Sequence, residues 1–245
     1  MVKRVYDFAE GNKDMKDLLG GKGANLAEMA NMGLRVPPGF TITTKTCAEF
    51  FAAKGNFPEG LWDEALLHLK KVEKATGKKF GDAKNPLLFS VRSGAPLSMP
   101  GMMDTVLNLG MNDSVAISLS KLTKDERFVY DAYRRFVTMF ADVVMGADRK
   151  EFDRIHEAWK EKEGAKSDPE LSAEALKNVV VEQKKLFNKI VKKEFPEDPY
   201  EQLKLAIAAV FNSWNTPRAI TYRKIENIPD DMGTACNVQT RYLAT

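Results

Sequence analysis

One stretch in the first half of the chain, residues 90–110, constrains the fold more than any other. Residues 87–91 overlap the start of this stretch. Their apolar side chains at alternate positions would share one face, and this pattern predicts a β-strand. Arg92 follows directly and leads into a loop that is rich in glycine, proline and methionine. The strand would therefore deliver one guanidinium group, at its carboxyl end, to a loop of small residues.

Two interpretations of Arg92 stay open on this local pattern. A guanidinium group binds phosphate through paired hydrogen bonds, and glycine lets an anion come close to the backbone. In the other interpretation the loop is an ordinary surface loop, and Arg92 pairs with a carboxylate. The local pattern favours neither over the other.

A second glycine-rich stretch, residues 20–23, reads Gly-Gly-Lys-Gly and precedes an expected helix that ends at Gly33. The buried face of that helix would carry Leu26, Met29, Ala30 and Met32. Free N–H groups at a helix start and the mobile charge of Lys22 together suit an anion. The stretch is not a P-loop, because that motif needs Ser or Thr where this chain has Gly23. In the alternative interpretation, the glycines only make the start of the helix more flexible, and Lys22 is exposed to solvent without a ligand.

Most of the remaining chain predicts helices. Residues 112–196 are rich in Lys and Glu and show long helical periodicity, which predicts a helical region. Thr46 and Glu49 have the spacing of a capping box, so a helix is expected to start at Thr46. His68 is expected to be a half-exposed helix residue rather than a ligand. Residues 236–242 alternate and predict a final strand.

Composition excludes several classes of protein. The net charge is only +3 and basic residues are interspersed with acidic ones, so no nucleic-acid surface is expected. No apolar run reaches the ~18 residues of a membrane span and the first residues lack a signal-peptide core, so no membrane contact is expected. The two cysteines lack metal or redox spacing, which indicates a reducing compartment, and we expect the protein to be cytoplasmic.

Six blocks of the sequence resemble the N-terminal, nucleotide-binding part of the pyruvate, phosphate dikinase family, in the expected order. They are residues 18–29, 90–95, 99–110, 130–136, 213–219 and 233–240. The block Met-Pro-Gly-Met-Met-Asp-Thr at residues 99–105 is similar to this family and not to the related pyruvate, water dikinases or rifampicin phosphotransferases. The resemblance runs along the whole chain.

The resemblance implies an α/β (α+β) fold of the ATP-grasp type, incomplete at its C-terminal side and with an inserted all-helical subdomain. Residues 1–111 and 198–245 would form the nucleotide-binding part, and residues 112–197 the insertion. ATP and Mg²⁺ are the implied ligands. Because the chain resembles only the first part of a whole dikinase, we expect this fragment alone to be inactive.

The resemblance also implies roles for five residues of the ATP site. Lys22 and Arg92 would contact the triphosphate. Gly101 and Thr105 would line the phosphate or sugar side through backbone or hydroxyl contacts. Gln239 would lie at the adenine, in a strand that forms the hinge beneath it.

A whole member of the family converts ATP, pyruvate and phosphate to AMP, phosphoenolpyruvate and pyrophosphate through a phosphohistidine. His68 and His156 do not lie in the Thr-Ser-His-Ala-Ala context of that histidine, so we expect no catalytic residue and no metal ligand in this chain. Pyruvate and phosphate would act only through missing domains. The full-length protein is expected to be a homodimer.

Some alternatives stay open at this point. The chain could instead belong to a pyruvate, water dikinase-like phosphotransferase or an antibiotic phosphotransferase. It would then still bind ATP, but the phosphoryl group would go to another acceptor. A module that binds a nucleotide without catalysis is the other alternative. Arg134 and Arg135 could bridge to phosphate or to a neighbouring subdomain, or form a salt-bridged structural pair.

Overall fold

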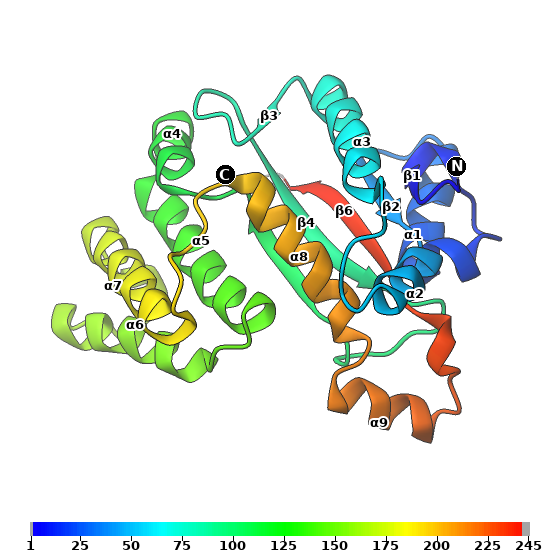
Figure 1. The fold of residues 1–245 in the computed structure, drawn as a ribbon. Helices are drawn as coiled ribbons and strands as arrows, with labels where there is room; N and C mark the ends of the chain where they lie inside the picture. The colour runs from blue at the N-terminus through cyan, green and yellow to red at the C-terminus, as the bar shows by residue number, and fades with distance from the viewer. Residues whose placement is uncertain (1, 242–245) are drawn as a thin grey trace. The chain divides into compact units, whose positions relative to one another are not determined.

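The computed structural model describes residues 2–241, which form two compact units. The first unit comprises residues 2–78, 89–105 and 204–241, and the second comprises residues 79–88 and 106–203. Strand β4 (Pro86–Gly94) contributes residues to both. Figure 1 labels most of the helices and strands of each unit, and the mixed α/β class that the sequence predicts is confirmed.

The first unit is built on a sheet whose last strand in sequence lies in its interior. In spatial order, this sheet contains β1 (Val5–Asp7), β2 (Gly39–Ile42), β6 (Ala235–Arg241) and the end of β4. The pairs β1–β2 and β2–β6 are antiparallel, with Gly39 opposite Gln239. The predicted final strand is β6, apart from Tyr242, which lies outside the described residues.

Helices cover both faces of this sheet. The helices of the first unit are α1 (Lys16–Asn31), α2 (Thr44–Ala52), α3 (Leu61–Thr76), α9 (Pro217–Ile225) and most of α8 (Pro199–Ser213), with single turns at Phe8–Glu10 and Asp230–Met232. A Cβ atom on Gly23 of α1 would lie 3.0 Å from Thr41 Oγ1 of β2. The His68 ring of α3 lies 6.0 Å from the Phe40 ring, centroid to centroid. Adjacent strand residues point to opposite faces, so α1 and α3 lie on opposite sides of β2.

Helix α1 differs from the prediction in its buried face. Met29 and Met32, which we expected to be buried, are 42% and 68% exposed. The buried residues are mostly small, and include Gly23, Ala24 and Ala27. Small side chains let α1 approach β2 and β6 more closely than leucine or methionine would, and hydrophobic periodicity alone does not reveal this. Gly33 follows the end of the helix with a φ of +76°, as predicted.

Two other local predictions are wrong. His68 is only 4% exposed, because its Nδ1 atom contacts the carboxylate of Asp7 from the neighbouring strand. Helix α2 begins before Thr46, because the Thr43 hydroxyl is its cap and accepts a hydrogen bond from the Thr46 N–H at 3.3 Å.

The strand that carries Arg92 is longer than predicted. It continues past Val91 to Gly94, so Arg92 belongs to the strand and not to the loop. The Ser93 N–H donates to the Asp104 carbonyl at 3.3 Å, which extends the pairing toward β5 (Thr105–Leu109). Arg92 is nevertheless the one exposed residue of β4.

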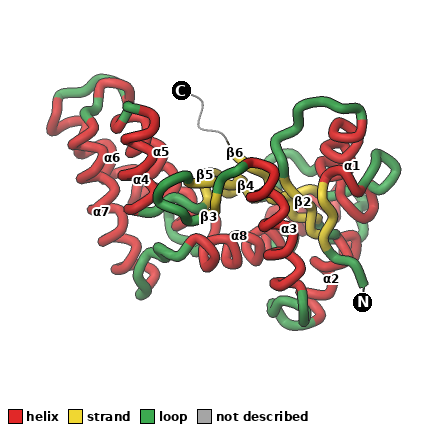
Figure 2. The backbone as a smooth tube through the Cα atoms, turned by 90° about the horizontal axis from the view of Figure 1, so that it is seen from above, coloured by secondary structure: helices red, strands yellow, loops and turns green. Residues whose placement is uncertain are grey.

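The second unit is mainly helical, and the helices that the sequence predicts after residue 112 are present. They are α4 (Asp113–Thr123), α5 (Glu126–Met139), α6 (Arg149–Glu163) and α7 (Ala173–Val191), with a π turn at Phe140–Val144 and a 3-10 turn at Asp168–Glu170. The unit also holds β3 (Lys79–Phe80), which runs parallel to the start of β4. Figure 2 shows these helices in red and the strands in yellow. No helix among residues 2–241 combines the length and hydropathy that crossing a membrane requires.

Aromatic rings fill the interior of the second unit. Phe195 packs against Phe136, Phe140 and Phe187, with centroid distances of 5.9, 5.5 and 5.3 Å. All four side chains are buried, and their edge-to-face arrangement is one that aromatic rings prefer. These contacts tie α5, the turn after it and α7 into one core.

Arg134 and Arg135 form salt bridges within this second unit. Arg134 is 7% exposed and lies 2.8 Å from Asp131 and 3.0 Å from Asp168. Arg135 lies 3.0 Å from the other oxygen of Asp131. Of the two interpretations of this arginine pair, the structural one accounts for these contacts.

Candidate functional site

The two glycine-rich stretches of the sequence meet in the first unit. Gly20 has a φ of +67°, which interrupts α1 and turns the chain toward the end of β4. The next residue, Gly21, donates its N–H to the Ala95 carbonyl at 2.9 Å. The turn before Lys22 is therefore fixed to the loop that follows Arg92.

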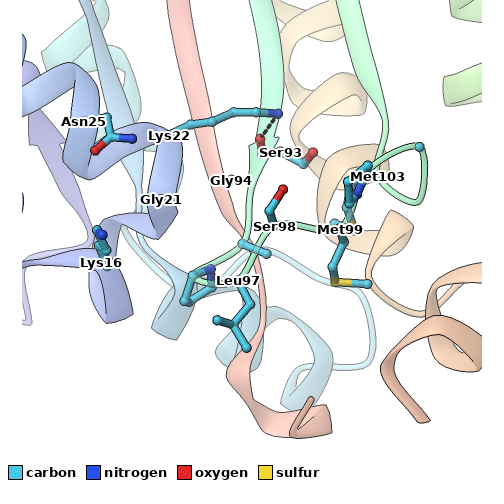
Figure 3. Close-up of a pocket in the computed structure, with 14 residues that line it drawn as sticks. Lys16, Gly21, Lys22, Asn25, Ser93, Gly94, Leu97, Ser98, Met99 and Met103 are labelled. Atoms are coloured by element: carbon cyan, nitrogen blue, oxygen red, sulfur yellow. Dashed lines mark hydrogen bonds between the residues drawn. The ribbon is translucent and has the colours of Figure 1, made fainter. Parts of the chain in front are cut away.

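A cavity of about 400 Å³ lies between this turn and that loop. Figure 3 shows Lys16, Lys22 and Asn25 on the α1 side, facing the segment from Ser93 to Met103. Gly101 also lines the cavity, with a φ of +71° and open space where a Cβ atom would be. None of the described side chains that line the cavity is a carboxylate. The cavity therefore suits an anionic ligand.

Lys22 extends across the cavity to β4. Its Nζ atom donates to the Ser93 carbonyl at 2.9 Å, as the dashed line in Figure 3 shows. Partial burial and the positive charge of Arg92 together lower the pKa of Lys22. Two cations that are close enough to repel each other create a local positive potential that a bound anion would relieve.

Arg92 is exposed and close enough to Lys22 to affect its pKa. It lies two residues before Gly94, whose Cβ position is 3.5 Å from the Lys22 Cβ atom, so Arg92 points to the side of the sheet on which Lys22 lies. Within residues 2–241, its guanidinium makes no hydrogen bond and no ion pair. The interpretation in which Arg92 pairs with a carboxylate is therefore not supported in this part of the chain. The group is available to an anion from solution.

The structure brings some of the predicted site residues together and leaves others apart. Lys22 and Gly101 line the cavity, and Arg92 adjoins Lys22. Thr105 begins β5, is half-buried and does not line the cavity. Gln239 is buried in β6 and does not line it either.

The Gln239 side chain is held by the segment before β2. Its Nε2 atom donates to the Pro37 carbonyl at 3.2 Å. Asn237 lies two residues earlier in the same strand, so the two side chains point to the same face. That is the face on which α1 packs, because Asn237 lies against Gly23. Gln239 and the cavity therefore share one side of the sheet.

Lys16 and Asn25 line the cavity from the α1 side, and we predicted neither. Asn25 lies three residues after Lys22 on a helix, and this spacing could have identified it. Lys16 could not have been identified in this way, because the break at Gly20 separates it from the helical periodicity of Lys22.

Two clusters of histidine and carboxylate side chains are candidates for metal binding, and none of their residues lines this cavity. They are Asp7, Glu10 and His68, and His156, Glu157 and Asp168. A lysine already occupies each cluster: Lys71 lies 2.7 Å from Asp7, and Lys160 lies 3.4 Å from Asp168. These positive charges would repel a metal ion, so neither cluster fits one.

The model of the pyruvate phosphate dikinase AMP/ATP-binding domain family matches residues 16–64 and 53–242. The match spans both glycine-rich stretches and β6. The chain belongs to the pyruvate phosphate dikinase AMP/ATP-binding domain family. The resemblance found in the six sequence blocks is thereby confirmed.

Individual members of the pyruvate phosphate dikinase family are similar to almost the whole of this chain. Pyruvate, phosphate dikinase 1 of Arabidopsis thaliana, a chloroplastic protein, is 53% identical over 241 residues, which are 97% of this chain and 25% of that protein. Pyruvate, phosphate dikinase of Clostridium symbiosum is 48% identical over 241 residues, which are 98% of this chain and 28% of that protein. The chain therefore spans about a quarter of the length of these curated relatives.

Proposed function

We propose that the cavity beside Lys22 binds the phosphate groups of ATP. The observation that carries this proposal is the closeness of Lys22 to an Arg92 guanidinium that has no partner among residues 2–241. Charged hydrogen bonds from both groups would neutralise a polyphosphate. Membership of a family of AMP/ATP-binding domains supports a nucleotide as the source of that polyphosphate.

The residues present fit such a ligand. The cavity of about 400 Å³ falls within the range of small-molecule sites. Lys22 and Arg92 would bind the triphosphate, and Gly101 would line the phosphate or sugar side. Thr105, which begins β5 outside the cavity, would contact that side where the ligand extends beyond the cavity. Gln239, with its neighbours in β6, would lie at the adenine, and its place on the same side of the sheet as the cavity supports this assignment.

The fit to Mg²⁺ is different. This ion prefers carboxylate and phosphate oxygens, and no carboxylate lines the described cavity. The described residues therefore do not form a magnesium site of their own. Mg²⁺ would come with the triphosphate, where it neutralises phosphate charge.

We further propose that the whole protein is a phosphotransferase that converts ATP, pyruvate and phosphate to AMP, phosphoenolpyruvate and pyrophosphate. Within it, residues 1–111 and 198–245 would form an ATP-grasp-type nucleotide-binding part with residues 112–197 as a helical insertion. Pyruvate and phosphate would bind elsewhere in the protein, which we propose to be a homodimer. The two described cysteines are free and buried, which supports a reducing, cytoplasmic setting.

The role of this chain within that reaction would be to bind and orient ATP. His68 and His156 are both buried and lie against the carboxylates of Asp7 and Asp168. A buried imidazole with this environment is poorly placed to accept a phosphoryl group. This supports a phosphohistidine elsewhere in the whole protein.

Calorimetric titration with Mg·ATP tests the proposed site. Lys22→Ala and Arg92→Ala should each weaken binding roughly 10- to 100-fold, because each removes a charged hydrogen-bond donor. Lys74→Ala is the matched control, since Lys74 is an exposed lysine in the last turn of α3. Unchanged affinity in the first two variants, or no binding by the unmodified chain, would contradict the proposal.

A further inference from the structure

Asn237 is a buried polar residue of β6 that the proposed ATP contacts do not use. Its side chain is 1% exposed. The Oδ1 atom accepts a hydrogen bond from Thr41 Oγ1 at 2.8 Å, and the Nδ2 atom donates to the Arg92 carbonyl at 3.5 Å. The amide therefore connects β2 with the residue in β4 that carries the exposed guanidinium.

The same amide lies against two glycines. A Cβ atom on Gly94 would lie 2.6 Å from Asn237 Nδ2, and one on Gly23 would lie 3.0 Å from Asn237 Oδ1. Gly23 directly follows Lys22, and the Cβ position of Gly94 is also 3.5 Å from the Lys22 Cβ atom. The Asn237 side chain is thus packed between the turn that carries Lys22 and the strand that carries Arg92.

We propose that Asn237 is a positioning residue that fixes the spacing between the Lys22 ammonium and the Arg92 guanidinium. The inference rests on the proposed function, since it concerns the same phosphate site. Two cations separate when nothing holds them, and binding of a polyphosphate is strongest when they are already held at the spacing of its oxygens. Asn237 would supply this restraint through its hydrogen bond to the Arg92 carbonyl and its packing against Gly23, the residue after Lys22.

The chemistry of the site explains why an amide suits this position. One end must accept a hydrogen bond from the Thr41 hydroxyl, and the other must donate to a carbonyl. Asparagine and glutamine offer both groups on a neutral planar side chain, and the two glycines leave room for the shorter one. An aspartate would add a negative charge that competes with the ligand for Lys22.

Three variants test this role. Asn237→Ala removes both contacts, and Thr41→Val removes only the hydroxyl that orients the amide, with little change in volume. Thr138→Val is the matched control, because Thr138 is a buried threonine of the second unit that accepts a hydrogen bond from Gln183 at 3.0 Å. All three should lose stability in urea unfolding, since each loses a buried hydrogen bond.

Calorimetry with Mg·ATP should distinguish a loss of ATP affinity caused by displaced cations from a general loss of fold stability. We expect the dissociation constant to rise roughly 10-fold in Asn237→Ala and roughly 3- to 5-fold in Thr41→Val, and to stay unchanged in Thr138→Val. If all three variants bind ATP as the unmodified chain does, Asn237 has only a structural role and the inference is overturned.

A second readout needs no nucleotide. In the unmodified chain, Arg92 contributes to the lowered pKa of Lys22, and NMR of ¹³C-labelled lysine side chains can follow this titration. In Thr41→Val the pKa of Lys22 should rise toward its ordinary value as Arg92 moves away, and an unchanged titration would contradict the inference. If the unmodified chain binds no ATP but the titration shifts, the proposed function fails while the positioning role stands.

Discussion

Gly20 lies directly against Gly94, with no side chain between the two backbones. A Cβ atom on Gly20 would lie 1.6 Å from the Gly94 carbonyl oxygen and 2.5 Å from its carbonyl carbon. Gly20 also has a φ of 67° and a ψ of 167°, a conformation that is almost restricted to glycine. The turn before Lys22 therefore depends on glycine for both space and conformation.

Gly20→Ala should lower the free energy of unfolding by about 3 kcal/mol or more, because the clash of the new Cβ atom with the Gly94 carbonyl and the backbone strain both destabilise the fold. Gly33→Ala is the control: its φ is also positive, at +76°, but nothing lies within 4 Å of the added atom. It should cost only about 1 kcal/mol. Urea unfolding of both variants gives the comparison, and equal losses would show that the close approach to Gly94 has no energetic weight.

The affinity for ATP should depend on pH through Lys22. Only the ammonium form carries the charge that attracts phosphate, so affinity should fall as the pH rises through the pKa of Lys22. Burial and Arg92 lower that pKa from its ordinary 10.5, so the fall should begin earlier than for an exposed lysine. Calorimetry from about pH 7 to about pH 10 should show the affinity decline progressively over this range. Lys22→Arg, whose guanidinium stays charged, should show a flat profile, and a parallel decline in it would count against Lys22 as the cause.

Arg223 should be difficult to replace even by lysine. It is 2% exposed, its guanidinium carbon lies 4.3 Å from the centre of the Trp214 ring, and its Nε atom donates to Asp230 at 2.9 Å. Arg223→Lys would lose the planar stacking and the forked hydrogen bonds, and should lower the free energy of unfolding by about 2–3 kcal/mol. Arg218→Lys, at an exposed ion pair with Asp104, should change it by less than about 1 kcal/mol in the same urea experiment. Similar losses for the two variants would contradict this account.

Asp168 should contribute stability that acid removes. Partial burial acts to raise its pKa, but His156, Arg134 and Lys160 outweigh burial and lower the pKa to about 2. A carboxyl with a lowered pKa stabilises the fold above its unfolded pKa of about 3.9, and this contribution is lost as the pH falls toward 2. After allowance for solvent screening, the contribution should be about 1 kcal/mol.

Asp168→Asn measures that contribution directly. The difference in unfolding free energy between the unmodified chain and the variant should be constant above about pH 5 and should shrink below about pH 4. Urea unfolding at a series of pH values gives this difference. A difference that does not change with pH would mean that the carboxylate charge is not the stabilising feature.

Periodicity predicted the helices whose buried faces are large and apolar. In α8, Leu203, Ile207, Val210 and Phe211 recur at helical spacing, and all four are buried. The same reasoning was wrong for α1, whose buried face is made of glycine and alanine. It was also wrong for His68, because its partner Asp7 lies 61 residues away in the chain.

Some residues of the candidate site can be identified from sequence motifs, and others only from the tertiary structure. Lys22 and Gly101 lie in motifs whose resemblance to the family singles them out, and both line the cavity. The surroundings of Asn237 arise from contacts with Thr41 and Arg92, which are 196 and 145 residues away. No local pattern carries that information, so the tertiary structure is needed to find it.

The interior position of β6 also affects how the chain can fold during its synthesis. β2 and β4 both emerge from the ribosome well before residues 235–241, which pair with β2 and lie next to β4. Until then β2 and β4 each have an edge without a β6 partner. Unpaired strand edges in partly folded chains can pair with other molecules. The restraint that Asn237 places on Arg92 can form only after translation reaches this strand, so the phosphate site should be among the last parts of the unit to become organised.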